Sequence, residues 1–196
     1  MSYRIYTTPG LIFKWVPIRE VDCLLSVFTY DLGLITVKAT GFFRPAAKMR
    51  GHVRPFVYSR VSLIKGRAGW RLVGAESYGL TESLIADREV CAGLERLFRL
   101  LNRLLMKEVM ERPIFSDLSG AVMMAIKDDS VAWSDLEVAL VVRWLYYLGY
   151  LPDHDSLRPY LELVEWEKSE FFRRLSRPRD PLVIKLINRS LRASGL

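Results

Sequence analysis

The sequence predicts a two-domain α+β fold, in which a small β-barrel is followed by an α-helical bundle. Strand-like patterns fill the first 78 residues, which carry 12 basic and 4 acidic side chains. Apolar side chains at helical spacing fill the remainder, which carries 17 basic and 18 acidic side chains. Because pattern and charge change at the same place, we expect domains at residues 1–78 and 79–196.

The first domain is expected to contain five short strands. Aromatic, β-branched or alternating side chains place them at residues 3–6 with 11–16, 23–30, 35–40, 56–65 and 70–75. Pro9-Gly10 marks a bend or bulge, residues 66–69 form a hairpin, and the alternation around Lys38 directs that side chain outward. Closure removes the exposed edges of such a short sheet, so the pattern favours an OB-fold barrel.

The second domain is expected to contain four to six helices. Leucines at helical spacing in residues 94–105 predict one of them, with three arginines on another side that are either a solvated face or a ligand contact. Ser134-Asp135-Leu136-Glu137 has the form of a capping box and opens an apolar, central helix that Gly149 ends. Asp180-Pro181 predicts the start of the last helix.

Residues 32–75 contain no Asp or Glu among 44 residues. Their nine basic side chains are Lys38, Arg44, Lys48, Arg50, Arg54, Arg60, Lys65, Arg67 and Arg71. Uncompensated positive charge is costly in a folded domain, so it indicates an external polyanion, most commonly nucleic acid. A surface charged merely for solubility is the alternative, although solubility requires no such segregation.

The segment from Phe42 to His52 adds two adjacent aromatic side chains to three of these cations. Aromatic rings can stack on unpaired bases while Arg and Lys neutralise phosphates. In the alternative interpretation, Phe42 and Phe43 pack beneath a flexible loop and only the cations face outward.

Motifs of catalysis and of metal binding are mostly absent. The chain has no phosphate-binding loop, dinucleotide fingerprint or nucleophile elbow, so we expect no enzyme and no cofactor. Two Cys and two His at these spacings make no zinc site, and Asp22 more plausibly stabilises a turn than joins Glu20 on a metal. With reduced cysteines and no membrane-spanning run, the chain is expected to be cytoplasmic.

Several of these residues together resemble the N-terminal pattern of the RecO family of bacterial recombination and repair mediators. In order, they are Gly10-Leu11-Ile12-Phe13-Lys14, Glu20-x-Asp22-x-Leu24, Phe28-Thr29, Gly33, Lys38-Ala39-x-Gly41, Arg44, Lys48, Arg50-Gly51 and Pro55-Phe56. The dense match covers about 50 residues, and the order of strands before helices extends it along the chain.

The resemblance implies a nucleoid-associated protein with an OB-fold and a helical domain. Such a protein binds single- and double-stranded DNA and anneals complementary strands without ATP. It also acts with RecR to load RecA on strands coated by single-stranded DNA-binding protein (SSB), whose acidic tail docks on the helical domain. The resemblance places DNA contacts on Lys38, Arg44, Lys48 and Arg50, with Lys14 and Arg54 as flanking candidates and Arg143 or Arg158 as candidates for the tail.

The chain also departs from the family pattern. Many members carry a four-cysteine zinc module after a segment that stands here as Leu148-Gly149-Tyr150-Leu151-Pro152, whereas this chain continues with Asp153-His154-Asp155. We therefore expect no zinc here. Two other classes of function remain open from the residues alone, namely an OB-fold RNA-binding module and a protein-interaction adaptor that meets an acidic partner.

Overall fold

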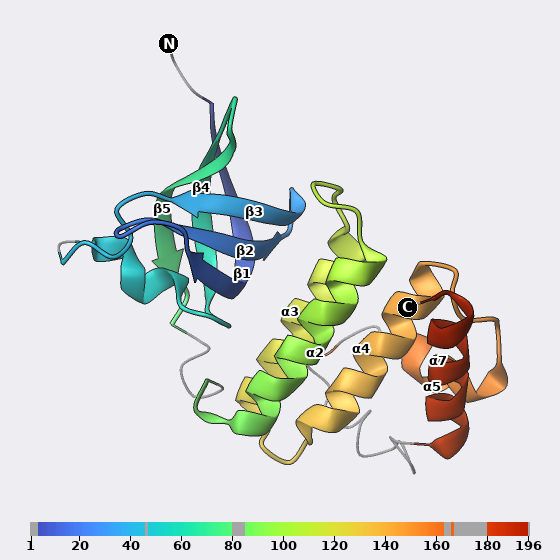
Figure 1. The fold of residues 1–196 in the computed structure, drawn as a ribbon. Helices are drawn as coiled ribbons and strands as arrows, with labels where there is room; N and C mark the ends of the chain where they lie inside the picture. Colours follow the sequence, from blue (N-terminus) through green and yellow to red (C-terminus); the bar gives the residue numbers. More distant parts are fainter. Residues whose placement is uncertain (1–3, 46, 80–84, 163–165, 167–179, 196) are drawn as a thin grey trace.

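The computed structural model describes residues 4–45, 47–79, 85–162, 166 and 180–195. Figure 1 shows a β-barrel built from the N-terminal strands beside a group of helices built from the rest of the described chain. No helix within these residues is long and apolar enough to cross a membrane.

Five strands close the barrel in the order β1-β2-β3-β5-β4, so that β1 pairs with both β2 and β4. The strands are β1 (Ile5–Pro17), β2 (Cys23–Thr29), β3 (Gly33–Ala39), β4 (Tyr58–Gly66) and β5 (Gly69–Ser77). The β3–β5 pair is parallel and the other neighbours are antiparallel. The predicted OB-type barrel is confirmed.

Strand β1 closes the barrel because it is long enough to serve two neighbours. Its first half pairs with β4 and its second half with β2, and the register on β2 shifts between Ile12 and Lys14. The expected irregularity at Pro9-Gly10 is therefore displaced by a few residues. Gly10 has another role, since a Cβ there would lie 2.9 Å from Cγ1 of Val27.

The connection from β3 to β4 is more ordered than the flexible loop that the sequence suggests. It contains the 3-10 helix η1 (Lys48–Val53), and Val53 at its end is fully buried in the barrel core. The hydroxyl of Ser59 on β4 donates a hydrogen bond to the carbonyl of His52. These contacts hold η1 against the barrel.

Five α-helices are described in the second half. They are α2 (Arg88–Leu104), α3 (Arg112–Lys127), α4 (Trp133–Tyr147), α5 (Arg158–Leu161) and α7 (Pro181–Ala193), with the 3-10 helix η2 (Asp155–Leu157) before α5. Helix α4 contacts α2, α3, α5 and α7, so the expectation of a central helix is confirmed.

The helix ends agree with the sequence at two places and differ at a third. Asp180 caps α7 by accepting a hydrogen bond from the Leu182 amide at 2.9 Å, and Gly149 follows α4 with φ +76°. The capping box at Ser134 does not form, because α4 already begins at Trp133 and its N-cap, Ala132, has no side-chain hydrogen bond.

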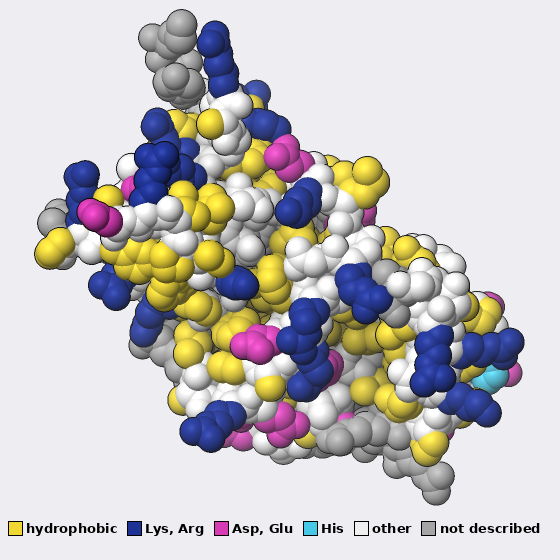
Figure 2. Space-filling view, in the orientation of Figure 1, with side chains coloured by type: hydrophobic (Ala, Val, Ile, Leu, Met, Phe, Trp, Pro, Cys, Tyr) yellow, Lys and Arg dark blue, Asp and Glu magenta, His cyan; other side chains and the backbone are white. Residues whose placement is uncertain are grey.

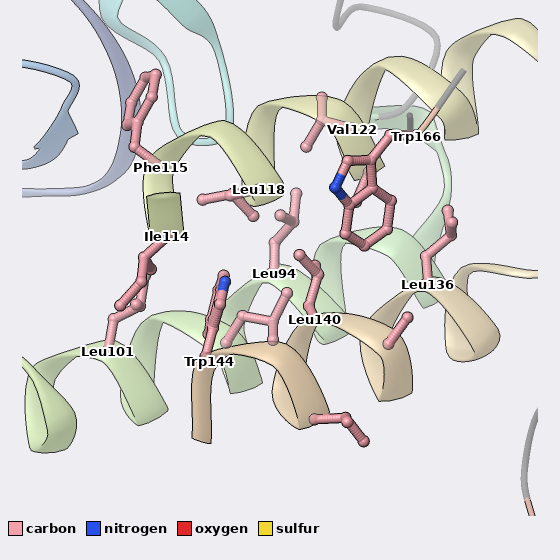
Figure 3. Packing of buried hydrophobic residues seen from close by; sticks show 14 of the residues in the cluster. Leu94, Leu101, Ile114, Phe115, Leu118, Val122, Leu136, Leu140, Trp144 and Trp166 are labelled. Carbon is pink, nitrogen blue, oxygen red and sulfur yellow. The ribbon is translucent and has the colours of Figure 1, made fainter. Parts of the chain in front are cut away.

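The two halves share one hydrophobic core. Barrel residues Phe28 and Leu34 belong to the same buried cluster as Leu94 and Leu140 of the helices, and the rings of Phe28 and Phe115 lie 5.4 Å apart. Figure 3 shows Phe115 on α3 directed towards the barrel strands while the labelled leucines fill the space between helices. A second cluster fills the barrel interior.

The connection between α2 and α3 fixes the helices to one end of the barrel. The Glu108 amide donates to the carbonyl of Leu34 at 3.1 Å, and Arg112 forms an ion pair with Asp31 at 3.1 Å. Gly33 has φ +68°, and a Cβ there would lie 1.8 Å from the carbonyl oxygen of Val109. Glycine thus permits the close approach of the two halves.

Candidate nucleic-acid interface

A hollow of about 760 Å³ lies on the barrel between the end of β3 and the β4–β5 hairpin. We call it the cationic groove. Its polar and aromatic lining residues include Lys38, Thr40, Lys65, Arg67, Trp70 and Arg71. Four of these side chains are basic, and no carboxylate is among the described lining residues. Figure 2 shows Lys and Arg side chains spread over the barrel half of the molecule, with few acidic ones between them.

Strand pairing brings these cations together. In the parallel β3–β5 pair, Val37 lies opposite Trp70 and Lys38 lies opposite Arg71. Because side chains alternate along a strand, Val37 and Trp70 enter the core while the two cations point outward. Like charges directly opposite each other destabilise a sheet. An anionic ligand in the groove would relieve this repulsion.

Arg67 reaches the groove from the hairpin. Gly66 pairs with Gly69 across β4 and β5, which leaves Arg67 and Ala68 as the two exposed residues of the turn. Gly69 has φ +99°, a conformation that glycine adopts without steric cost. A tight turn with a basic side chain is thereby held beside β3.

Part of the positive charge is compensated, contrary to the simplest expectation from the acid-free segment. Among the described side chains, carboxylates from outside that segment form the pairs Lys38–Asp22 at 3.1 Å, Arg60–Glu76 at 3.9 Å and Lys65–Glu108. Within the described chain, no carboxylate lies within ion-pair distance of Arg44, Arg67 or Arg71. The charge available to a ligand is therefore concentrated on fewer residues.

Asp22 positions Lys38 and the turn that follows β3. Its buried carboxylate accepts a hydrogen bond from the Gly41 amide at 2.9 Å and pairs with Lys38 through its other oxygen. The Gly41 amide, followed by Lys38, lowers the pKa of Asp22 below its ordinary value. Asp22 thus stabilises a turn, but that turn belongs to the neighbouring strand. No group of three possible metal-ligating side chains occurs among the described residues.

The aromatic residues after β3 are mainly packed. Phe42 is buried, and its ring lies 6.0 Å from Trp15 and 5.1 Å from the half-buried ring of Phe43. The Arg50 guanidinium lies over the Phe43 ring at 5.8 Å. The packed alternative is therefore right for Phe42, whereas Phe43 keeps partial access to solvent.

The other predicted DNA contacts are distributed around the barrel. Lys14 is exposed on β1, and Arg44 is exposed beside Gly41. Arg50 and Arg54 line an apolar cleft near α2, away from the groove lining. Lys48 lies in η1, and its side chain is outside the described part of the structure. Of the predicted contacts whose side chains are described, the structure thus brings Lys38 alone into the cationic groove.

The two arginines suggested for a partner differ in their surroundings. Arg143 is buried, pairs with Asp117 at 2.8 Å and donates to the Tyr160 carbonyl at 3.1 Å. It therefore holds the helices together and presents no guanidinium to a docking peptide, which corrects the interpretation of this residue as a surface contact. Arg158 is exposed and lies 3.2 Å from Asp155.

The match to known proteins is clearest over the barrel. Residues 1–76 match the family described as "Recombination protein O N terminal". These residues of the chain are therefore similar to the N-terminal domain of RecO proteins. All the described residues that line the cationic groove lie within this match.

Curated RecO relatives extend the match into the helices. The chain is 31% identical over 74 residues to the DNA repair protein RecO of Gloeothece citriformis, and 36% identical over 87 residues to that of Desulforudis audaxviator. These alignments cover 38% and 44% of this chain and 26% and 35% of the relatives. The RecO of Trichodesmium erythraeum is 26% identical over 149 residues, which cover 74% of this chain and 51% of the relative. The aligned part therefore spans a quarter to a half of the length of these relatives.

Arg67 and Arg71 belong to the acid-free segment of the sequence, but they are not among the predicted DNA contacts. The tight turn between Gly66 and Gly69 was a usable signal for Arg67, since it predicted an exposed hairpin tip. For Arg71 the deciding fact is its position opposite Lys38. That pairing joins residues 33 positions apart and follows only from closure of the barrel.

Proposed function

We propose that the barrel binds the phosphate backbone of DNA through the cationic groove, and that the chain acts as a recombination mediator in DNA repair. One observation carries the proposal: Lys38 and Arg71 lie opposite each other on adjacent strands, with Lys65 and Arg67 lining the same hollow. The RecO family of the domain and the curated names of its relatives support DNA as the polyanion.

The groove would act by replacing counterions. Each phosphate that contacts Arg or Lys releases condensed cations. On a single strand, the logarithm of the binding constant therefore falls by about 0.7 per contact for each tenfold rise in salt concentration. Neutralising two strands on one surface lowers their mutual repulsion and lets complementary bases meet. This mechanism for annealing needs no ATP, in accordance with the expectation that the chain is not an enzyme.

The remaining family properties are part of the same proposal. We infer binding to single- and double-stranded DNA, and cooperation with RecR in loading RecA on strands coated by SSB. Besides Lys38, five cations are further candidate contacts, namely Lys14, Arg44, Lys48, Arg50 and Arg54. For the acidic SSB tail, Arg158 is the exposed member of the pair considered above.

The test compares two double variants with the same loss of charge. Arg67→Ala/Arg71→Ala removes two groove cations, and Lys185→Ala/Arg189→Ala removes two exposed cations from α7. Fluorescence anisotropy of a labelled oligothymidylate across a salt series measures the binding constant of each. For the groove variant, we expect the slope of log binding constant against log salt concentration to become shallower by roughly 1.4, which is about 0.7 for each of two lost contacts. We also expect it to anneal complementary strands more slowly.

The α7 variant should keep the slope of the natural chain. Equal effects of the two variants would show a response to net charge alone and would contradict the groove. Tighter binding of a matched RNA would favour the RNA-binding alternative. Negligible DNA affinity at physiological salt, together with a co-purifying acidic partner, would favour the adaptor.

A further inference from the structure

A second hollow, of about 620 Å³, lies where the barrel meets the start of α2. We call it the junction cleft. Its walls are mainly apolar, with Trp15 and Phe42 from the barrel, Phe56 before β4, and Cys91 from α2. Arg50 and Arg54 also line it, and no carboxylate is among its described lining residues. Its volume lies in the range of roughly 300–1,000 Å³ that small-molecule sites occupy.

The cleft contains the bulkier of the two non-glycine residues with positive φ in the described chain. Phe56 has φ +64°, which is unfavourable for a large side chain. Hydrogen bonds hold this conformation, since the Phe56 amide donates to the Ile12 carbonyl at 2.6 Å and the Val57 amide donates to that of Arg54 at 3.1 Å. Residues kept in such conformations cluster at ligand sites. The backbone thus fixes both Phe56 and the adjacent Arg54.

The cleft and the cationic groove are both lined by the segment of chain that follows β3. Thr40 lines the groove and Phe42 lines the cleft, so one residue, Gly41, stands between these two lining residues, which an extended chain would hold at most about 7 Å apart. In Figure 2, hydrophobic side chains gather on the barrel close to the Lys and Arg side chains. A polymer several units long whose phosphates lie in the groove can therefore extend along this segment to the cleft.

We propose that the junction cleft receives an unpaired nucleobase from a single strand of DNA whose backbone lies in the cationic groove. The inference rests on the proposed function and adds a preference for single strands. Aromatic walls suit the faces of a base, and the two arginines suit the phosphates on either side of it. A base paired inside a duplex cannot enter, so a duplex would use the groove alone.

The thiol of Cys91 reports occupancy of the cleft in the natural chain. Cys91 is half-buried and lines the cleft, whereas Cys23 is fully buried in the barrel. Burial raises the pKa of Cys23 to about 11, and burial with Asp87 and Glu95 nearby also raises the pKa of Cys91. Because Cys91 is the more exposed of the two thiols, alkylation at alkaline pH should modify it while Cys23 stays protected, and a Cys91→Ser variant should remain unmodified.

The experiment measures the alkylation rate of Cys91 with three ligands at saturating concentration. They are an oligothymidylate, an abasic oligomer with the same number of phosphates, and a DNA duplex. We expect the oligothymidylate to slow alkylation at least tenfold and the other two ligands to leave it nearly unchanged. Anisotropy measures binding of all three separately, so occupancy of the groove and occupancy of the cleft are observed independently.

Equal protection by the three ligands, or protection by none although all bind, would overturn the cleft assignment and leave the groove intact. Absence of binding by any ligand would overturn the proposed function and this inference with it. Protection by an acidic, apolar peptide but not by oligothymidylate would assign the cleft to a protein. As a second arm, Trp15→Ala should reduce the preference for oligothymidylate over the abasic oligomer, with groove binding retained as the check on folding.

Discussion

Asp22 shows how a single carboxylate serves both stability and the groove. It joins the turn after β3 to the loop before β2, and it holds Lys38 through an ion pair at 3.1 Å. Its pKa is lowered on folding, first by the Gly41 amide and then by Lys38. The stabilisation is therefore present above the ordinary carboxyl pKa of about 4 and is lost as the pH falls through the lower value of the folded state.

The change Asp22→Asn should make the chain less stable at neutral pH, because the charged acceptor is lost. The difference from the natural chain should shrink as the pH falls and the natural carboxyl becomes protonated. Urea unfolding at neutral and acidic pH measures both quantities. Glu20→Gln, at an exposed position of the same loop, is the matched control. A difference that stays constant with pH would contradict the role of the Asp22 charge.

Arg143 illustrates a residue whose function cannot be judged from its charge. Its guanidinium bonds to Asp117 and to the carbonyl of Tyr160, and the Asp117 carboxylate also accepts from the Trp166 indole at 3.0 Å. Figure 3 shows Trp166 next to Val122, so the indole packs against α3. These contacts join α3, α4 and α5 through one buried ion pair.

Arg143→Ala should lower the free energy of unfolding by roughly 3–5 kcal/mol, because it leaves Asp117 buried without its charged partner. Arg158→Ala, at the exposed arginine considered for the same role, should change it by about 0.5 kcal/mol or less. Urea denaturation followed by tryptophan fluorescence compares the two variants. Similar small effects would mean that Arg143 contributes little to the helical core.

At the scale of elements, local patterns were sufficient for most strands and helices. The alternation from Ile35 to Thr40 correctly directed Lys38 outward, and Asp180-Pro181 correctly began α7. Prediction failed where packing between distant segments decides. Ser134 does not cap α4, because the helix extends one residue further and buries Trp133 against α2. The position of Arg71 opposite Lys38 likewise depends on closure of the barrel.

Gly93 shows why such packing is invisible in the local pattern. Within α2 it resembles a weak helix position, yet a Cβ there would lie 1.8 Å from the Trp133 indole nitrogen. A Cβ at Gly120 on α3 would likewise lie 2.5 Å from Cδ1 of the Trp166 ring. Two mid-helix glycines thus make room for two tryptophans from elsewhere in the chain.

Gly93→Ala should destabilise the chain, although the same change in an exposed helix interior stabilises by about 1 kcal/mol. The reason is that Trp133 must move, and overpacking typically costs about 1–3 kcal/mol. Thermal unfolding measures the effect of Gly93→Ala in the natural chain and again in a Trp133→Leu variant. The difference between the two effects gives the coupling between the two positions. An increase in melting temperature for the single variant would contradict the close packing of α2 and α4.

At the scale of the whole molecule, the proposed DNA-binding surface lies on a barrel that the helices support. The shared core and the connection around Glu108 attach α2 and α3 to the barrel, while the cationic groove lies on the barrel itself. The sequence predicted a barrel followed by helices, and the polyanion that it indicated stays a prediction. It could not separate cations with carboxylate partners from those without, because Glu108 reaches Lys65 across 43 positions of the chain.

The central claim is that nucleic acid lies along the cationic groove. Amide hydrogen exchange of the full chain, with and without saturating oligothymidylate, tests it most directly by locating the contact. The groove predicts slower exchange at residues 36–41 and 64–71, with α4 and α7 unchanged. Slower exchange confined to the helices, with residues 64–71 unaffected by bound DNA, would contradict it.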